Sequence, residues 1–411
     1  MPEKEMEDFR GECIAFLDAN APRRSGGGPP EWGEGSDAVA IFEELSEEEE
    51  RAAVANAKDW GRRRAEAGLH WISGPQHYGG RGLGSAHERV YRRAEAQYDV
   101  PNQSYFGVGL GMVAPTVLSH GTELVRERYL AKMYIGEIIA CQLFSEPGAG
   151  SDLAGVSTRA TRSGDNWKIS GQKVWTSGAH YSDIGEILCR TSPDAPKHKG
   201  LTAFIVDMNT PGVEVRRLRQ MTGGSSFNEV FLDDVVVPDT HRLGEINEGW
   251  SVALTTLMSE RASIGSSSTQ GGLTGARRRM TQLLQNVGDP DDLVLRQQLS
   301  QLLIDFTAME FTSKRAMAEI GAGREPGPEF SLAKMGLSAN LSHASDFVSE
   351  VLGLKVCADS GEWGTYSWSR FVCGTPGSRI AGGTDEILRN IVAERVLGLP
   401  KEPTAERGAR S

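Results

Sequence analysis

The residues best suited to hold a flat, polar-edged cofactor lie in the segment 146–152, which reads Glu-Pro-Gly-Ala-Gly-Ser-Asp and follows the apolar run 141–144. Gly148 and Gly150 carry no side chain, so a bulky partner can approach the backbone closely. Ser145 and Ser151 place hydroxyls on either side of that bare backbone. The segment lacks the Gly-Lys-Ser/Thr ending of a nucleotide P-loop and the three-glycine dinucleotide fingerprint. It therefore predicts a binding loop for a cofactor of another kind.

A carboxyl group that can accept a proton stands in the pair Glu260-Arg261, within a segment of helical periodicity. Apolar residues fall on one stripe of this predicted helix at Trp250, Leu254, Leu257, Met258, Ile264 and Gly265. Glu260 lies at the edge of the stripe, where partial loss of water suits a general base. Arg261 falls in the middle of the stripe and needs a partner there. A surface or ion-paired Glu260 and a structural ion pair of Arg261 are the alternatives.

A third candidate segment, 380–387, reads Ile-Ala-Gly-Gly-Thr-Asp-Glu-Ile. Thr384 is predicted to cap a helix whose first turn holds Asp385 and Glu386, because carboxylates favour the positive end of the helix dipole. Gly382 and Gly383 allow a ligand to come close to the backbone. The segment by itself is equally compatible with a plain helix entry.

Four segments together resemble the acyl-CoA dehydrogenases, in the order found in that family. They are the loop 145–152, the run 171–177 (Gly-Gln-Lys-Val-Trp-Thr-Ser), the strand-like run 228–238 and the turn 382–387. The resemblance covers nearly the whole chain. It implies FAD-dependent oxidation of an acyl-CoA thioester to the trans-2-enoyl thioester in lipid degradation by β-oxidation. The electrons would pass to an electron-transferring flavoprotein.

The resemblance also assigns roles to individual residues, and it implies no metal. Trp175 would pack beside the flavin, Ser177 would hydrogen-bond flavin N5, and Ser145 would face the pyrimidine edge. The implied cofactor-binding set is Phe144, Ser145, Gly150, Ser151, Trp175, Thr176, Ser177, Thr384 and Glu386. The implied substrate-binding set is Ser151 at the pantetheine arm, Arg261 at the CoA part, and Gly382 and Gly383 at the thioester. The backbone N–H of Gly382 and a flavin ribityl hydroxyl would bind the thioester oxygen.

The resemblance places the proton acceptor at one of two positions. Many members carry a Glu immediately before the Gly-Thr of the C-terminal turn, where this sequence has Gly382. A minority branch, which includes isovaleryl- and long-chain-type enzymes, carries the acid in a Glu-Arg pair on the first long C-terminal helix. This sequence has that pair at Glu260 and Arg261. Glu260 is therefore the predicted catalytic base.

Two segments depart from the family pattern. The Arg-x-x-Phe-Gly segment, which in most members reaches a neighbouring subunit's FAD pyrophosphate, is absent from residues 276–292. Glu350 and Leu354 replace the polar and tiny residues of a second cross-subunit segment, and a carboxylate near a pyrophosphate is repulsive. The departures are similar to those of bacterial members acting on sterol side chains or other bulky acyl groups. A half-site or non-catalytic subunit of a heteromer, or a flavin oxidase or acyl-carrier-protein-dependent enzyme, are the alternatives.

Hydrophobic periodicity predicts the elements that position these residues. Residues 1–138 have helical spacing, residues 139–243 contain short β-branched runs bounded by Pro-Gly and Pro-Asp turns, and residues 244–411 return to helical spacing. An α+β fold with an N-terminal helical domain, a middle β-domain and a C-terminal helical bundle is expected. The family's architecture is similar, with the flavin between the β-domain and the C-terminal helices. The resemblance implies a homo- or hetero-tetramer built as a dimer of dimers.

Composition excludes several other classes. The 411 residues are 39% hydrophobic with a net charge of −11, which predicts a globular chain and argues against nucleic acid as a partner. The five cysteines form no Cys-x-x-Cys pair, which favours reduced thiols in a cytoplasmic protein. No apolar run reaches the roughly 18 residues of a membrane helix, and the polar N-terminus predicts no signal peptide.

Overall fold

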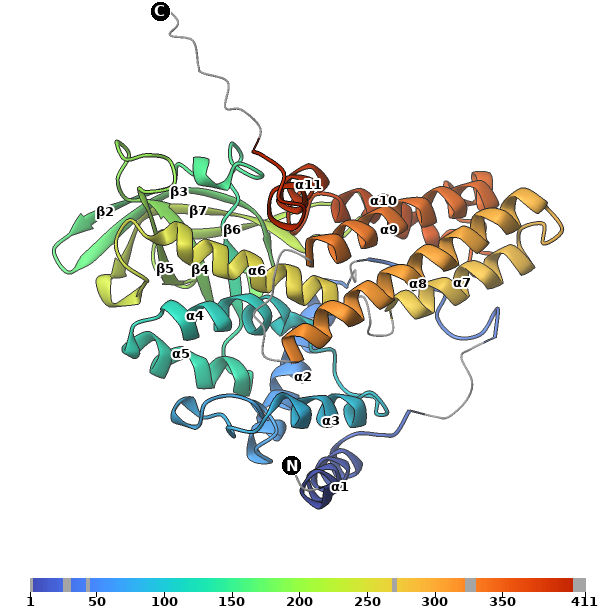
Figure 1. Cartoon of the computed structure of the whole chain (residues 1–411), viewed down its shortest axis with the longest axis horizontal. Helices are drawn as coiled ribbons and strands as arrows, with labels where there is room; N and C mark the ends of the chain where they lie inside the picture. The colour runs from blue at the N-terminus through green and yellow to red at the C-terminus, as the bar shows by residue number, and fades with distance from the viewer. Residues whose placement is uncertain (1–2, 25–30, 42–44, 268–271, 322–329, 402–411) are drawn as a thin grey trace, which may run out of the picture. The chain divides into compact units, whose positions relative to one another are not determined.

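The computed structural model describes residues 3–24, 31–41, 45–267, 272–321 and 330–401 (Figure 1). The chain forms two compact units. The first comprises Met1–Gly35 and Phe42–Ser263, and the second comprises Ser36–Ile41 and Ile264–Ser411.

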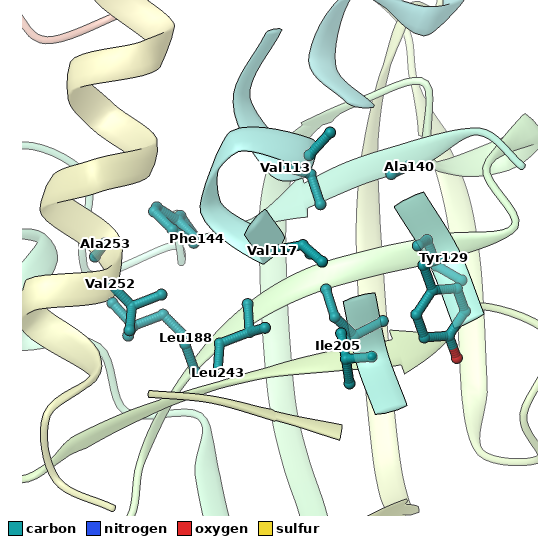
Figure 2. Close-up of a cluster of buried hydrophobic side chains, with 14 of the residues drawn as sticks. Val113, Val117, Tyr129, Ala140, Phe144, Leu188, Ile205, Leu243, Val252 and Ala253 are labelled. Atoms are coloured by element: carbon teal, nitrogen blue, oxygen red, sulfur yellow. The ribbon is translucent and has the colours of Figure 1, made fainter. Parts of the chain in front are cut away.

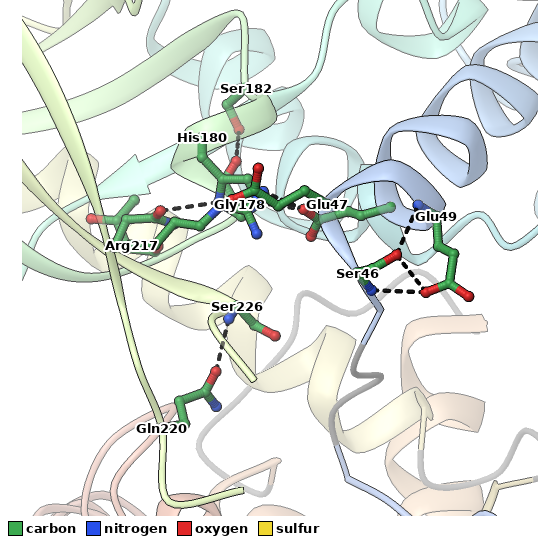
Figure 3. Close-up of polar contacts among 12 residues, drawn as sticks. Ser46, Glu47, Glu49, Gly178, His180, Ser182, Arg217, Gln220 and Ser226 are labelled. Carbon is green, nitrogen blue, oxygen red and sulfur yellow. Dashed lines mark hydrogen bonds and ion pairs between the residues drawn. The ribbon is translucent and has the colours of Figure 1, made fainter. Parts of the chain in front are cut away.

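The first unit begins with five α-helices. They are α1 (Glu3–Asn20), α2 (Glu47–Glu66), α3 (Ser85–Glu95), α4 (Ala114–His120) and α5 (Glu123–Ile135), and a π-helical segment, Gly109–Val113, leads into α4. Ser46 starts α2 with a capping box, because its hydroxyl accepts from Glu49 N while the Glu49 carboxylate accepts from Ser46 N (Figure 3). The Thr122 hydroxyl caps α5 by accepting a hydrogen bond from Val125 N.

The strands of the first unit form one mixed sheet. They are β1 (Ala140–Leu143), β2 (Arg159–Ser163), β3 (Asn166–Ser177), β4 (Ile184–Arg190), β5 (Leu201–Asp207), β6 (Val213–Leu218), β7 (Phe227–Pro238) and β8 (Arg242–Leu243). The strand order is β6-β7-β3-β2-β4-β5-β8, and β1 pairs in parallel with β4. The longest pairing is antiparallel, between β3 and β7.

Both faces of the sheet are covered, so β5 is apolar almost throughout. Phe204 and Val206 point to one face and pack with Trp167, Ile169 and Val230. Ala203 and Ile205 point to the other face, as the two-residue period of a strand requires. On that second face they meet helices α4, α5 and α6 (Gly249–Ser267), where Val117, Tyr129 and Val252 complete the cluster (Figure 2).

A buried ion pair ties the end of β1 to β3 and β4. Lys173 Nζ on β3 lies 2.9 Å from Glu146 Oε1, and the two side chains are 0% and 4% exposed. Lys173 also donates to the carbonyls of Phe144 and Leu188, while Glu146 accepts from Ser157 N and Oγ. Burial raises the pKa of Glu146, but Lys173 and the hydrogen bonds outweigh it and lower the pKa to about 2. Both charges are thus compensated inside the fold.

Helix α6 (Gly249–Ser267) leaves the sheet and carries the predicted base. Its fully buried side chains are Val252, Ala253 and Thr256, which face the sheet and α4. The stripe expected from the sequence is therefore rotated: Leu254, Leu257 and Met258 are only half buried. Short side chains line the inner face because the helix lies close to the sheet. The side chains of Ile264 and Gly265, also assigned to the stripe, lie outside the described part.

The second unit is a helical bundle. Its helices are α7 (Gly272–Asn286), α8 (Leu293–Gly321), α9 (Phe330–Leu352), α10 (Trp368–Ser378) and α11 (Asp385–Ile391). Residues 36–41 belong to this unit, because Asp37 accepts from Gly364 N at 3.0 Å and Ser36 O accepts from Arg279 at 2.6 Å. No helix in the described ranges is long and apolar enough to cross a membrane.

The predicted succession of helices, strands and helices is confirmed, and the fold is α+β. The domain boundaries after residues 138 and 243 stay predictions. All five cysteines are free thiols, as expected, and Cys13, Cys141 and Cys189 are buried.

We expect Phe204→Ala to lower the free energy of unfolding by about 3–5 kcal/mol, because it empties a fully buried site against Trp167. Phe311→Ala is the matched control, since Phe311 is 65% exposed. The measurement is chemical denaturation of both variants. Equal losses in the two variants would contradict the burial described here.

We expect Lys173→Met to lower the free energy of unfolding by about 3–5 kcal/mol, because Glu146 is left charged and unpaired in the interior. Lys168→Met, which breaks the exposed pair with Asp234, should cost under about 1 kcal/mol. In the parent, the depressed pKa of Glu146 gives a stabilisation that is complete above its ordinary value of 4.5 and is lost as pH falls toward about 2. Acid titrations of stability should show this dependence in the parent and lose it in Glu146→Gln.

Candidate cofactor and active site

The loop after β1 keeps its backbone open. Glu146 and Ala149 exchange backbone hydrogen bonds of 2.9 and 3.0 Å, which closes the loop into a tight turn. An added Cβ at Gly148 or Gly150 would meet no other atom within 4 Å. Ser145 is half buried at the start of the loop and Ser151 is exposed at its end, while Phe144 is buried in the core. The loop therefore presents bare main chain at Gly148 and Gly150 and the side chain of Ser151 to solvent.

An irregularity in β3 turns Trp175 outward. The pairing with β7 shifts between Lys173 and Thr176, and Trp175 has the left-handed φ of +59°. A bulge of this kind re-aims one side chain relative to the strand. The indole is 62% exposed, and its ring lies edge-on to Phe227 with centroids 6.2 Å apart. A large exposed aromatic ring held by a strained backbone is a surface on which a flat ring system can pack.

The bulge and the open loop lie against each other. Val174 N donates to Ser145 O at 2.9 Å, so the residue before Trp175 is bonded to the residue before Glu146. Thr176 follows the bulge as a buried residue, and its hydroxyl has no hydrogen-bond partner among the described residues. Ser177 is exposed at the end of the strand. The two sequence-predicted segments, Phe144 to Ser151 and Trp175 to Ser177, thus lie side by side.

A polar cluster around His180, which the sequence did not indicate, supports the end of β3 (Figure 3). Asn228 donates its amide N–H to Thr176 O at 2.9 Å, which turns its oxygen toward His180 Nδ1 at 3.0 Å. His180 Nε2 faces Glu50 Oε2 at 2.9 Å, and Glu50 also binds Arg217. Both ring nitrogens therefore face oxygen atoms of neighbouring side chains. The cluster joins α2 to the strand that presents Ser177.

Glu260 lies on the inner side of α6. It follows the fully buried Thr256 by four residues and precedes Ser263 by three, so the three side chains share one face of the helix. A Cβ added at Gly111 would lie 2.9 Å from Ser263 Oγ, which shows how closely the π-helical segment approaches this face. Glu260 and Arg261 are both half buried. A half-buried carboxylate on a core-facing helix surface can accept a proton from a bound ligand.

The C-terminal turn belongs to the second unit and has the predicted cap. Thr384 Oγ1 accepts from Ile387 N at 3.3 Å, which starts α11. Gly382 and Gly383 have φ of +70° and +96°, in the region that favours glycine. The buried Lys334 donates to Gly383 O at 2.7 Å, so the turn is held from α9. Glu386 is exposed, so of its cofactor role the structure shows only an accessible carboxylate.

The residues present fit a flavin. The open backbone around Gly148 and Gly150, the exposed indole and the hydroxyls of Ser145 and Ser177 supply a flat apolar wall with hydrogen-bonding edges. Glu350, one of the departures noted above, accepts from the Gln298 amide at 2.9 Å within its own unit.

Family models match three consecutive parts of the chain. They are the acyl-CoA dehydrogenase N-terminal domain over residues 37–137, the middle domain over residues 141–235 and the C-terminal domain over residues 247–397. The matches follow the same order along the chain as the helices, sheet and helical bundle described above.

Curated relatives match most of the chain. Acyl-CoA dehydrogenase IpdE1 of Mycobacterium tuberculosis is 36% identical over 357 residues, which cover 86% of this chain and 90% of that protein. Acyl-CoA dehydrogenase FadE34 of the same organism is 39% identical over 375 residues, which cover 89% of this chain and 48% of that protein. The chain therefore spans about half the length of the latter relative.

Two solved structures share the fold. One is a steroid ACAD, Tcur3481-Tcur3483, with a TM-score of 0.73 and 24% identity, covering 98% of this chain and 99% of that chain. The other is the ChsE4-ChsE5 complex from Mycobacterium tuberculosis, with a TM-score of 0.71 and 24% identity over the same shares of the two chains. The cofactor of such enzymes is FAD, and the chain belongs to the acyl-CoA dehydrogenase family.

Proposed function

We propose that this chain catalyses the FAD-dependent α,β-dehydrogenation of an acyl-CoA thioester, with Glu260 as the base that removes the α-proton. The observation that carries this assignment is the place of Glu260 on α6. It lies half buried on the same face as the fully buried Thr256, although it is a charged residue at the margin of an apolar core. A carboxylate held there can meet a bound acyl chain rather than bulk water.

The reaction removes a proton and a hydride from neighbouring carbons. The Cα–H bond breaks as its proton passes to the Glu260 carboxylate, and the electron pair forms the new double bond as hydride leaves Cβ. FAD supplies the hydride acceptor. Ser145 and Ser177 would orient it by hydrogen bonds and Trp175 would cover it, while Thr176, Gly150 and Phe144 would shape the surface beneath. The product is the trans-2-enoyl thioester.

Gly382 is the donor to the thioester oxygen in this proposal, through its backbone N–H. Its φ of +70° argues against a side chain at this position, because a non-glycine residue there costs about 1–2 kcal/mol. A glycine at 382 is therefore compatible with a base located elsewhere. Gly383 leaves the approach open, and Lys334 holds the turn from behind.

The acyl group and the assembly belong to the same proposal. We expect a bulky acyl-CoA, with Ser151 near the pantetheine arm and Arg261 toward the CoA part, and an electron-transferring flavoprotein as acceptor. A steroid ACAD and a two-component complex among the solved structures of this fold support that choice. The missing Arg-x-x-Phe-Gly segment favours a non-identical partner subunit in a tetramer. Flavin content of the chain purified alone and with a partner would separate homo- from hetero-assembly.

We expect Glu260→Gln to bind FAD with an unchanged visible spectrum and to lose bleaching by acyl-CoA under nitrogen by at least about 10³-fold, because the amide cannot accept the proton. The measurement is stopped-flow absorbance of the bound flavin with thioesters of graded bulk. Glu248→Gln, which changes an exposed carboxylate just before α6, is the matched control and should bleach at the parental rate.

Bleaching of Glu260→Gln at the parental rate would refute the assignment of the base. A chain that is colourless alone and with every partner would refute the flavoenzyme itself. Rapid peroxide formation in air by the parent would show that the chain is an oxidase rather than a dehydrogenase.

A further inference from the structure

Glu186 is an acid in the middle of an apolar sheet face. It is the third residue of the seven-residue strand β4, between Gln142 on β1 and Ile205 on β5. Its neighbours two residues away, Ile184 and Leu188, both belong to the cluster that faces α4 and α6 (Figure 2). Glu186 is 0% exposed. A carboxyl group in this place needs a structural reason.

One hydroxyl chain meets this acid. Thr256 Oγ1 on α6 lies 2.6 Å from Glu186 Oε1 and 3.2 Å from Val252 O. Thr116 Oγ1 on α4 lies 2.9 Å from Thr256 Oγ1 and donates to Met112 O. Thr116 and Thr256 are fully buried, and Glu186 Oε2 has no hydrogen-bond partner among the described residues. The chain therefore joins the sheet to two helices through a single carboxyl oxygen.

The geometry fits a neutral carboxylic acid. An ionised carboxylate would leave Oε2 charged and unsatisfied in the interior. A protonated one donates to Thr256, which can then donate to Thr116, which in turn donates to Met112 O. The groups packed against it are uncharged: Gln142 from β1, Ile205 from β5, Thr256 from α6 and, behind it, Thr116 from α4. Burial raises the pKa of Glu186 to about 8, against which only the Thr256 hydroxyl acts.

The hydroxyl chain passes through Thr256, one helical turn from the proposed base. Thr256 and Glu260 are four residues apart on α6 and therefore neighbours on the same face. One turn farther, Ser263 lies against Gly111. Rotation or sliding of α6 would break the Glu186–Thr256 contact and would change where the Glu260 carboxylate points.

We propose that Glu186 is a positioning residue: as a neutral acid it binds Thr256 and fixes the rotation and register of α6 that aim Glu260 at the substrate α-carbon. The proposal rests on the function proposed for Glu260. Glu186 is not itself a proton acceptor in the reaction, because its oxygens are closed off from ligand and solvent. Small displacements of a base cost large factors in rate.

The proposal gives a pH dependence with a definite sign. Because the pKa of Glu186 is raised, its protonated form stabilises the fold fully below the ordinary value of 4.5, and this contribution is lost as pH rises through about 8. Alkaline pH should therefore weaken the Glu186–Thr256 contact that holds α6 against the sheet. Glutamine at this position has nearly the same shape and supplies an amide N–H donor in place of the carboxyl O–H, but it cannot ionise.

The experiment compares Glu186→Gln, Glu186→Leu and Thr256→Val as FAD-loaded enzymes, with Thr255→Val as the matched control, since the Thr255 hydroxyl faces His120 instead. Glu186→Gln should reduce its flavin within about twofold of the parent and lose less thermal stability between pH 6 and pH 9. Thr256→Val and Glu186→Leu should slow flavin reduction about 10- to 100-fold. Both should keep the parental flavin spectrum and the parental Kd for a non-reacting thioether analogue of the substrate.

Flavin reduction at the parental rate in Thr256→Val would overturn the proposal, and this variant serves even if Glu186→Leu does not fold. An equal rate loss in Thr255→Val would also overturn it, because any change on α6 would then suffice. An unchanged pH dependence of stability in Glu186→Gln would show that the acid is not neutral in the fold. Failure of Glu260 itself is seen separately, in Glu260→Gln.

Discussion

The buried ion pair between Glu146 and Lys173 is the interaction on which the candidate cofactor surface depends. It joins the open loop after β1 to the strand that presents Trp175 and, through the carbonyl of Leu188, to β4. Because both charges lie in the interior, removing either partner would leave the other as an uncompensated buried charge, which would lower the free energy of unfolding. The open backbone at Gly148 and Gly150 can therefore stay bare and accessible while its ends are fixed.

Two buried acids of the first unit have opposite charge states for a simple reason. The Glu146 carboxylate contacts the ammonium group of Lys173 and accepts from backbone N–H groups, so it remains ionised in the interior. Glu186 has one hydroxyl and apolar neighbours, so it stays neutral. The first holds the cofactor loop and the second holds α6. The candidate site thus depends on one charged interaction, Glu146–Lys173, and one uncharged interaction, Glu186–Thr256. Acid weakens the first and alkali weakens the second.

The fold class and the order of elements could be predicted from the sequence, whereas the binding roles of the candidate segments stay predictions. Helical and strand periods differ over long stretches, and the segments 145–152, 171–177 and 382–387 carry turn residues whose geometry is local. Thr384 caps α11 as predicted for that reason. The inner face of α6 could not be read in this way, because the buried Val252, Ala253 and Thr256 have smaller side chains than the half-buried Leu254, Leu257 and Met258. Close packing selected the shorter side chains.

The sequence by itself determined the chemistry available: an acid on α6, glycine in the C-terminal turn, and hydroxyls around a bare loop. Only the tertiary structure decided which buried acids are charged and what holds the helix that carries the proposed base. Glu50 and His180 are 130 residues apart, and Glu186 and Thr256 are 70 residues apart. A lone Glu in a seven-residue apolar strand was the one local signal for the latter pair. Charge state depends on burial and partners, which exist only once distant segments have packed together.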